Sequence, residues 1–268
     1  MSGVAHVARV LRHAARSGFS DFGNTYTVWS WAFGLLLRML TQVAFFTSIG
    51  RLLDSEAHVE FLFVGNAVAA AAVGCLTATT ATVWERRAGT LPLLVASPTS
   101  PLVVLMGRST FFIANGLAFS VGALVLVPPL FDVEIPMARF PALLALVVLM
   151  AVTTYFLATF LGGLVLRTPS AARTVPQVAR LTIMAFCGVS VPRSVFPEAV
   201  SRLAGFLPVT HGLDAVRELL GEGRPGAVLT GAGLELLVGA GWLVASLVTF
   251  RRLAEAGRRD GSIVFSAA

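Results

Sequence analysis

Lysine is absent from the 268 residues, and all twenty basic side chains are arginines. Charged residues make up only 13% of the chain, whereas hydrophobic residues make up 56%, and the mean hydropathy is +0.82. A soluble domain carries about 25% charged residues, so this composition does not fit a protein with one aqueous core. The missing lysine excludes the phosphate-binding loop of ATPases, Schiff-base chemistry and Ser–Lys dyads.

Cysteine and histidine are also scarce. Cys75 and Cys187 lie in apolar runs, where we expect buried free thiols and no disulfide framework. The four histidines are scattered without metal-ligand spacing, so we expect no metal site and no cofactor on this chain.

Long apolar runs dominate what is present. Six stretches reach the roughly 20 residues that a membrane-spanning helix needs. They are Trp29–Ile49, Phe61–Val83, Leu102–Leu130, Pro141–Leu166, Val175–Phe196 and Ala227–Phe250. We therefore predict an all-α membrane protein with one six-span domain over residues 29–250, preceded by residues 1–28 and followed by a tail over residues 251–268.

The distribution of charge predicts the orientation. With both termini in the cytoplasm, the inner segments hold thirteen arginines and four acidic residues, a net charge of +9. The outer segments then hold six arginines and nine acidic residues, a net charge of −3. Positive residues favour the cytoplasmic side, so we predict a multi-pass membrane protein with both termini inside. The pI of about 10.8 then reports orientation, and we expect no nucleic-acid partner.

Three segments outside these spans have patterns of their own. Val4–Gly18 has an apolar and a basic face, which indicates a helix lying on membrane lipid or a simple positive flank. Trp84–Pro98 begins charged and becomes apolar, which predicts a short cytoplasmic helix that docks a soluble partner. In Pro192–Gly226, apolar runs broken by Pro197 and Pro208 predict two half-helices that dip back from the outer face.

Two motifs resemble one family. The loop Trp84–Pro98 reads WERRAGTLPLLVASP and is similar to the E-x-E/R-R-x-G-T-L-E-x-L-L-x-S-P signature of ABC-2 type transporter permeases, where it forms the coupling helix. Leu207–Arg217 reads LPVTHGLDAVR and resembles the family segment L-P-x-T-x-x-x-(D/E)-x-x-R. Pro92 stands where the family often has Glu, which confines the expected helix to Leu93 onward.

This resemblance implies a half-transporter. Two permease subunits, identical or paired with a sister chain, would assemble with two separate nucleotide-binding subunits that hold ATP and Mg. The closest resemblance is to drug-resistance and antibiotic-export permeases, so the substrate implied is a hydrophobic or amphipathic molecule moved outward.

The coupling segment holds the residues that we expect to contact the ATPase. They are Glu85, Arg86, Arg87, Gly89, Thr90, Leu91, Leu94 and Val95. The charged members can form charge-assisted contacts, the apolar members can fill a groove, and Gly89 permits unusual backbone angles. Arg86 and Arg87 could instead serve only as topological anchors.

Arg38 falls near the middle of the first predicted span, and Glu235 falls about one-third into the last. An arginine at a helix centre costs about 2.5–3.5 kcal/mol on insertion scales, so a partner or a wet cavity is expected. Similar depths suggest an Arg38–Glu235 ion pair. The alternative is that Arg38 extends to the inner interface near Gln42.

The remaining candidates are polar or aromatic side chains in apolar surroundings. The possible substrate pathway comprises Asn66, Thr77, Thr80, Phe111 and Asn115, and the outer hairpin comprises Pro208, His211, Asp214 and Arg217. Two other classes compete with the permease interpretation. Ser190 with His211 and Asp214 could form an intramembrane hydrolase, although no nucleophile motif surrounds the serine. An ATP-independent secondary transporter or channel would need repeats or several buried ionisable groups, which we do not find.

Overall fold

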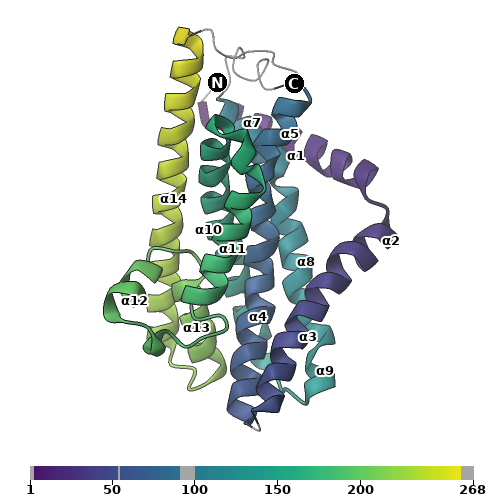
Figure 1. Cartoon of the computed structure of the whole chain (residues 1–268), viewed down its shortest axis with the longest axis vertical. Coiled ribbons are helices and arrows are strands. Elements are labelled where there is room, and N and C mark those ends of the chain that lie inside the picture. Colours follow the sequence, from purple (N-terminus) through teal and green to yellow (C-terminus); the bar gives the residue numbers. More distant parts are fainter. Residues whose placement is uncertain (1–2, 54, 91–99, 261–268) are drawn as a thin grey trace.

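A computed structural model describes residues 3–53, 55–90 and 100–260 of the chain. These residues form an elongated helical bundle without β-strands (Figure 1). Its helices and helical turns are α1 (Gly3–Thr25), α2 (Val28–Trp31), η1 (Ala32–Leu36), α3 (Leu37–Leu52), α4 (Glu56–Leu76), η2 (Thr77–Thr80), α5 (Ala81–Arg87), α7 (Pro101–Ser109), α8 (Phe111–Leu126), α9 (Pro128–Phe131), η3 (Met137–Arg139), α10 (Phe140–Arg167), η4 (Pro169–Ala172), α11 (Thr174–Phe186), η5 (Arg193–Val195), α12 (Glu198–Ala204), α13 (Thr210–Leu220) and α14 (Pro225–Asp260).

Helix α4 lies at the centre of the bundle, where its residues from Leu62 to Leu76 are all buried. It packs against α3, α8 and α10. A Cβ atom at Gly74 would come within 2.5 Å of Gly116 Cα in α8, so the absence of side chains lets the two backbones approach closely. Small residues at such crossings are typical of membrane helices, whose association depends on close packing.

Within the part of the chain that the structure describes, five helices are long and apolar enough to cross a membrane. They are Val28–Leu52, Glu56–Arg87, Pro101–Leu126, Met137–Leu166 and Pro225–Ala256. They correspond to the first four and the last of the six predicted stretches, so the all-helical membrane architecture is confirmed and the count of six is not.

The predicted stretch Val175–Phe196 is not one helix. Helix α11 has only 13 residues and ends at Phe186, which makes it about 20 Å long against a hydrocarbon core of about 30 Å. Gly188 follows with a φ of +82°, a conformation that interrupts a right-handed helix. The rest of the stretch is irregular up to the short turn η5.

The two ends of the bundle differ in charge. Helices α5 and α7 and the last turns of α14 lie at one end of the bundle, and α1 lies across that end (Figure 1). The exposed residues of α5 and α14 there include Arg86, Arg87, Arg251 and Arg252. The loops before α4, after α9 and between α13 and α14 lie at the opposite end, which is rich in acidic residues. The start of α1 and the end of α14 therefore lie at the same end of the bundle, which we call the arginine-rich end.

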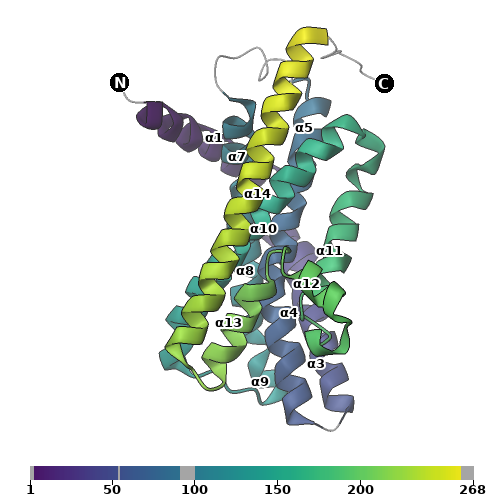
Figure 2. The same cartoon turned by 90° about the vertical axis from the view of Figure 1, so that its left-hand side faces the viewer.

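Helix α1 crosses the bundle instead of running along it, as the second view shows (Figure 2). It packs on α7, where a Cβ atom at Gly18 would overlap the carbonyl oxygen of Arg108 and one at Gly107 would come within 2.5 Å of Ala14 Cβ. The outer face of α1 is exposed and carries its arginines, as an interfacial helix requires.

Candidate functional site

A cavity of about 440 Å³ lies among α1, α3, α4, α8 and α11. Four of the five predicted pathway residues line it, namely Thr77, Thr80, Phe111 and Asn115. The Asn115 side-chain oxygen accepts a 2.6 Å hydrogen bond from Trp31 Nε1, and Thr80 Oγ1 donates to the Thr77 carbonyl at 2.7 Å. The cavity volume falls within the range of small-molecule sites.

Asn66 does not line this cavity. Its side chain is buried within the bundle and donates to the Leu62 carbonyl, one turn earlier in α4, at 2.9 Å. A polar residue on an apolar helix need not face a pathway, because a side-chain amide can donate to a carbonyl of its own helix instead.

Aromatic side chains form one wall of the cavity. The rings of Phe22 and Phe111 lie 5.0 Å apart, those of Phe111 and Phe112 4.0 Å, and those of Trp84 and Phe112 6.0 Å. These contacts join α1, α5 and α8 into a continuous aromatic surface, which suits an apolar or aromatic ligand body.

Three arginines also line the cavity: Arg38, Arg173 and Arg180. Arg38 lies near the middle of a predicted span, whereas Arg173 and Arg180 lie just before and near the start of another and belong to the thirteen inner arginines. Arg38 belongs to α3, Arg173 lies between η4 and α11, and Arg180 belongs to α11. No spacing within the sequence reveals that these three residues line one cavity.

Arg38 and Glu235 are not paired, which corrects the predicted ion pair. Arg38 lies in α3 and Glu235 in α14, and these helices stand on opposite sides of the bundle (Figure 1). The rise per residue fixes the depth of each charge but not the direction in which its side chain points. Gln42 is hydrogen-bonded to Arg180, not to Arg38.

Glu235 instead caps helix α13. Its carboxylate is fully buried, and Oε1 accepts hydrogen bonds from Thr153 Oγ1 at 2.5 Å and from the backbone amide of Val209 at 2.8 Å. Oε2 accepts from the amide of Gly212 at 3.0 Å. Free amides and the positive end of the helix dipole compensate the negative charge without a cation.

The same carboxylate supports an unusual backbone. Val209, the residue before α13, has a φ of +81°, which is rare for a β-branched residue. Its amide hydrogen bond to Glu235 fixes the sharp turn after Pro208, so the last long helix positions the start of α13.

In the coupling segment, Glu85 has an internal role. Its carboxylate is buried and pairs with Arg108 Nε at 2.7 Å, and Arg108 also contacts Asp21 of α1 at 2.8 Å. Thr90 Oγ1 donates to Glu85 Oε2, and the Thr90 amide donates to the Glu85 carbonyl at 3.1 Å. Glu85 thus ties the start of the segment to α7 and, through Arg108, to α1.

The following residues face outward. Arg86 and Arg87 are exposed, although Arg86 also donates to the Leu166 carbonyl of α10 at 3.3 Å. Gly89 adopts a φ of +70° with open space around it, so its conformation rather than crowding favours glycine. Leu91, Leu94 and Val95 lie outside the described residues.

The outer hairpin residues lie together at the other end, and the short helices α12 and α13 occupy the segment in which two half-helices were predicted. Pro208 is buried, His211 Nε2 lies 3.0 Å from the Gly205 carbonyl oxygen, and Asp214 pairs with Arg193 at 2.5 Å. Asp214 therefore serves an ion pair rather than orienting His211, which does not fit the Ser190 hydrolase alternative.

Arg217 links α13 to α4 and the loop after α11. Its guanidinium stacks 3.7 Å from the centre of the Phe61 ring and donates to the Gly188 carbonyl at 2.7 Å. A cation on an aromatic face and a carbonyl acceptor are two favourable partners for a guanidinium.

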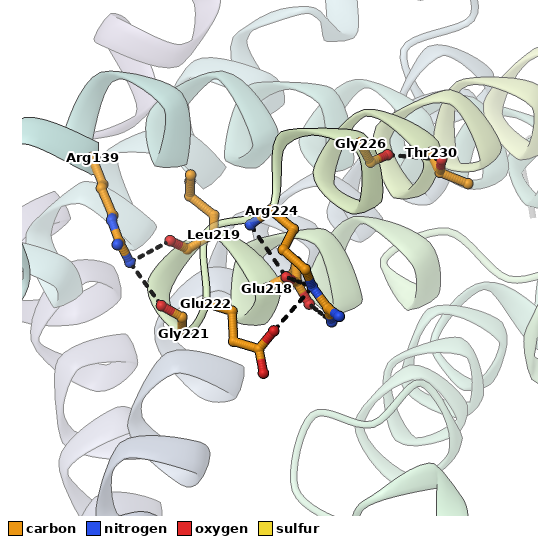
Figure 3. A network of polar contacts seen from close by, with 8 residues as sticks. All are labelled: Arg139, Glu218, Leu219, Gly221, Glu222, Arg224, Gly226 and Thr230. Carbon is orange, nitrogen blue, oxygen red and sulfur yellow. Dashed lines mark hydrogen bonds and ion pairs between the residues drawn. The ribbon is translucent and has the colours of Figure 1, made fainter.

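A polar network closes the turn between α13 and α14 (Figure 3). Arg139 donates to the carbonyls of Leu219 and Gly221 at the end of α13, at 2.8 and 3.0 Å, so its positive charge caps the helix C-terminus. Arg224 binds Glu218 through Nε at 2.7 Å and contacts Glu222 at 3.1 Å. Hydrogen bonds from Arg224 lower the pKa of the Glu218 carboxyl, and the same contact raises the pKa of Arg224.

Long apolar helices around an amphipathic cavity define a multi-pass membrane protein with a small-molecule-sized site. Residues 55–254 match the family model described as ABC-2 family transporter protein. The chain therefore belongs to the ABC-2 family and is a permease of an ABC-type transporter. No curated protein is significantly similar to it.

Proposed function

We propose that the chain is the permease subunit of an ATP-driven exporter that moves a hydrophobic or amphipathic molecule outward across the bacterial plasma membrane. Two permease subunits, identical or paired with a sister chain, would assemble with two nucleotide-binding subunits that hold ATP and Mg. The arginine-rich end, which contains both ends of the described chain, would face the cytoplasm.

One observation carries this proposal: the cavity lies directly beside the coupling segment. Trp84 lines the cavity, and the exposed Arg86 and Arg87 follow it in α5. A partner that pushes on these arginines would move a helix that forms the cavity wall. Work on a substrate requires such differential contact between two states.

The remaining elements take their roles from this arrangement. Helix α1 would lie on the lipid of the cytoplasmic face. Helix α11, too short to cross alone, would complete a sixth crossing together with the irregular chain after it, with α12 and α13 forming a hairpin in the outer part of the membrane. Backbone of this kind is tolerated at that depth where it packs in protein, as α13 packs on α10 and α14.

The test is ATP hydrolysis by the complex reconstituted in liposomes. The double variant Arg86→Glu/Arg87→Glu should lower the hydrolysis rate at least about ten-fold, because charge reversal replaces attraction by repulsion at the docking surface. The control Arg251→Glu/Arg252→Glu reverses two exposed arginines at the same end and should leave it unchanged. An unchanged rate in the first variant would contradict the docking role, and transport driven by an ion gradient without ATP would favour the secondary transporter.

A further inference from the structure

The cavity among α1, α3, α4, α8 and α11 has a strongly uneven distribution of charge. Arg38, Arg173 and Arg180 line it, and no carboxylate is among the described residues on its walls. A cavity with three positive charges and no negative one is a site for an anion.

These arginines also lack the carboxylate partners that several other arginines have. Arg180 hydrogen-bonds only the neutral Gln42, and Arg38 and Arg173 make no ion pair or side-chain hydrogen bond within the described part of the chain. Several other arginines of the bundle pair with carboxylates. Such pairs are Arg108–Glu85, Arg193–Asp214, Arg224–Glu218 and Arg51–Asp132.

Arg38 is the most informative of the three. It lies near the middle of the span Val28–Leu52, about 15 Å along the helix from Val28. A charge at that depth costs free energy unless water or a counter-ion meets it, and intramembrane charges of this kind generally serve function. Arg180 of α11 lines the same cavity as Arg38, so an anion in the cavity would meet both positive charges.

Apart from Tyr26, Thr77, Thr80, Asn115 and Gln177, the rest of the cavity lining is apolar. Its aromatic wall, from Phe22 through Phe111 and Phe112 to Trp84, lies on α1, α8 and α5, whereas the arginines belong to α3 and to the region of η4 and α11. A ligand that satisfies both surfaces needs an anionic group and an apolar body. An inorganic anion would leave the aromatic wall unused, and a cation would be repelled.

We propose that this cavity binds an anionic amphipath, a molecule with a carboxylate or phosphate group and an apolar body, and that this is the class of molecule transported. The second clause rests on the proposed exporter function. The same chemistry occurs in a free amphipath and in an anionic phospholipid, so the experiment separates these two sources.

The experiment uses the purified full chain in phosphatidylcholine nanodiscs. A palmitic acid that carries a photoreactive diazirine is the anionic probe, and the amine of equal chain length with the same diazirine is the cationic probe. After illumination, mass spectrometry of peptides locates the label. We expect the acid to label peptides of α3, α8 and α11 at least about ten-fold more than the amine does.

Substitutions assign the selectivity to the arginines. Arg38→Gln and Arg180→Gln should each reduce labelling by the acid about ten-fold, whereas Arg38→Lys should retain most of it. Arg51→Gln, in the same helix as Arg38 but at the outer end, is the matched control and should not change it. Equal labelling by the two probes, or labelling that persists in both glutamine variants, would overturn the proposal. The comparison between probes needs no variant, so it decides even if a variant fails to fold.

Two further arms identify the source and separate the two proposals. Replacing 30% of the phosphatidylcholine by phosphatidylglycerol should reduce labelling if an anionic phospholipid is the ligand and leave it unchanged if a free amphipath is; both results support an anionic site. Adding the ATPase subunit with ATP and Mg should release the acid. Charge-selective binding without ATP-dependent release would leave the site standing and reject its role in transport.

Discussion

The carboxylate of Glu235 accepts a 3.0 Å hydrogen bond from the backbone amide of Gly212, so a side chain of α14 caps the first turn of α13. Glu235→Ala would leave the buried amides of Val209 and Gly212 and the hydroxyl of Thr153 without this acceptor. Each orphaned buried donor costs about 1–3 kcal/mol, so we expect a clear fall in thermal stability and faster hydrogen exchange in α13.

Two comparisons define this prediction. Glu235→Gln keeps one acceptor oxygen and should lose less stability than Glu235→Ala. Glu255→Gln changes an exposed carboxylate in the same helix and should have no measurable effect. Equal stability of the alanine variant and the wild type would show that the cap is unimportant.

The ion pair of Glu85 with Arg108 should stabilise the arginine-rich end. Glu85→Gln removes a buried charged acceptor, and we expect a loss of about 1–3 kcal/mol in the free energy of unfolding. Asp21 is the other partner of Arg108, and the Asp21 side chain is 56% exposed. Asp21→Asn should therefore cost less than about 1 kcal/mol. Thermal unfolding in detergent measures both, and a larger effect of Asp21→Asn would reverse the assignment.

Close packing of α1 on α7 depends on Gly18. Gly18→Ala would bring a methyl group into the backbone of Arg108, which cannot move as a side chain can, and overpacking of this kind costs about 1–3 kcal/mol. We expect faster hydrogen exchange throughout α1. Gly23→Ala, in the same helix with open space around it, should be neutral or stabilise the helix by up to about 1 kcal/mol. Similar exchange in the two variants would contradict the tight crossing.

The contact of Glu218 with Arg224 should weaken as the pH falls. The folded-state pKa of Glu218 is lowered, so the contact contributes stability above the unfolded-state value of about 4.3 and loses it as the pH falls through the folded-state pKa. We expect hydrogen exchange at residues 218–226, corrected for its intrinsic pH dependence, to become faster below about pH 4. Glu218→Gln should remove this change, and a persistent change would assign it to another group.

Sequence reasoning recovered the features that depend on apolar length. A run of about 20 apolar residues must become a spanning helix in lipid, so the helices around α4, α10 and α14 followed directly. The segment Val175–Phe196 is not one continuous helix, because Gly188 interrupts it and hydropathy does not register that interruption. Arg180, Pro192 and Arg193, at or near the ends of this stretch, are the sequence signals that set it apart from the other five.

The contacts of the buried charges were harder to predict, because their partners cannot be recognised in the sequence as opposite charges. Glu235 finds backbone amides, which every residue carries, so a search for an opposite charge led wrongly to Arg38. Arg173 and Arg180 join Arg38 only because α3 and α11 pack around one cavity. Thr77, Thr80, Phe111 and Asn115 line the cavity, where polar and aromatic groups interrupt otherwise apolar helices, and their place in a substrate pathway stays a prediction.

The most direct test of the permease account is the composition of the complex. The tagged full chain can be extracted from its native membrane in mild detergent, and the polypeptides that co-purify can be quantified by mass spectrometry. The account predicts a separate nucleotide-binding subunit in equal amount with the chain, retained by Arg251→Glu/Arg252→Glu and lost from Arg86→Glu/Arg87→Glu. A chain that purifies in transport-competent form without any ATP-hydrolysing subunit would contradict it.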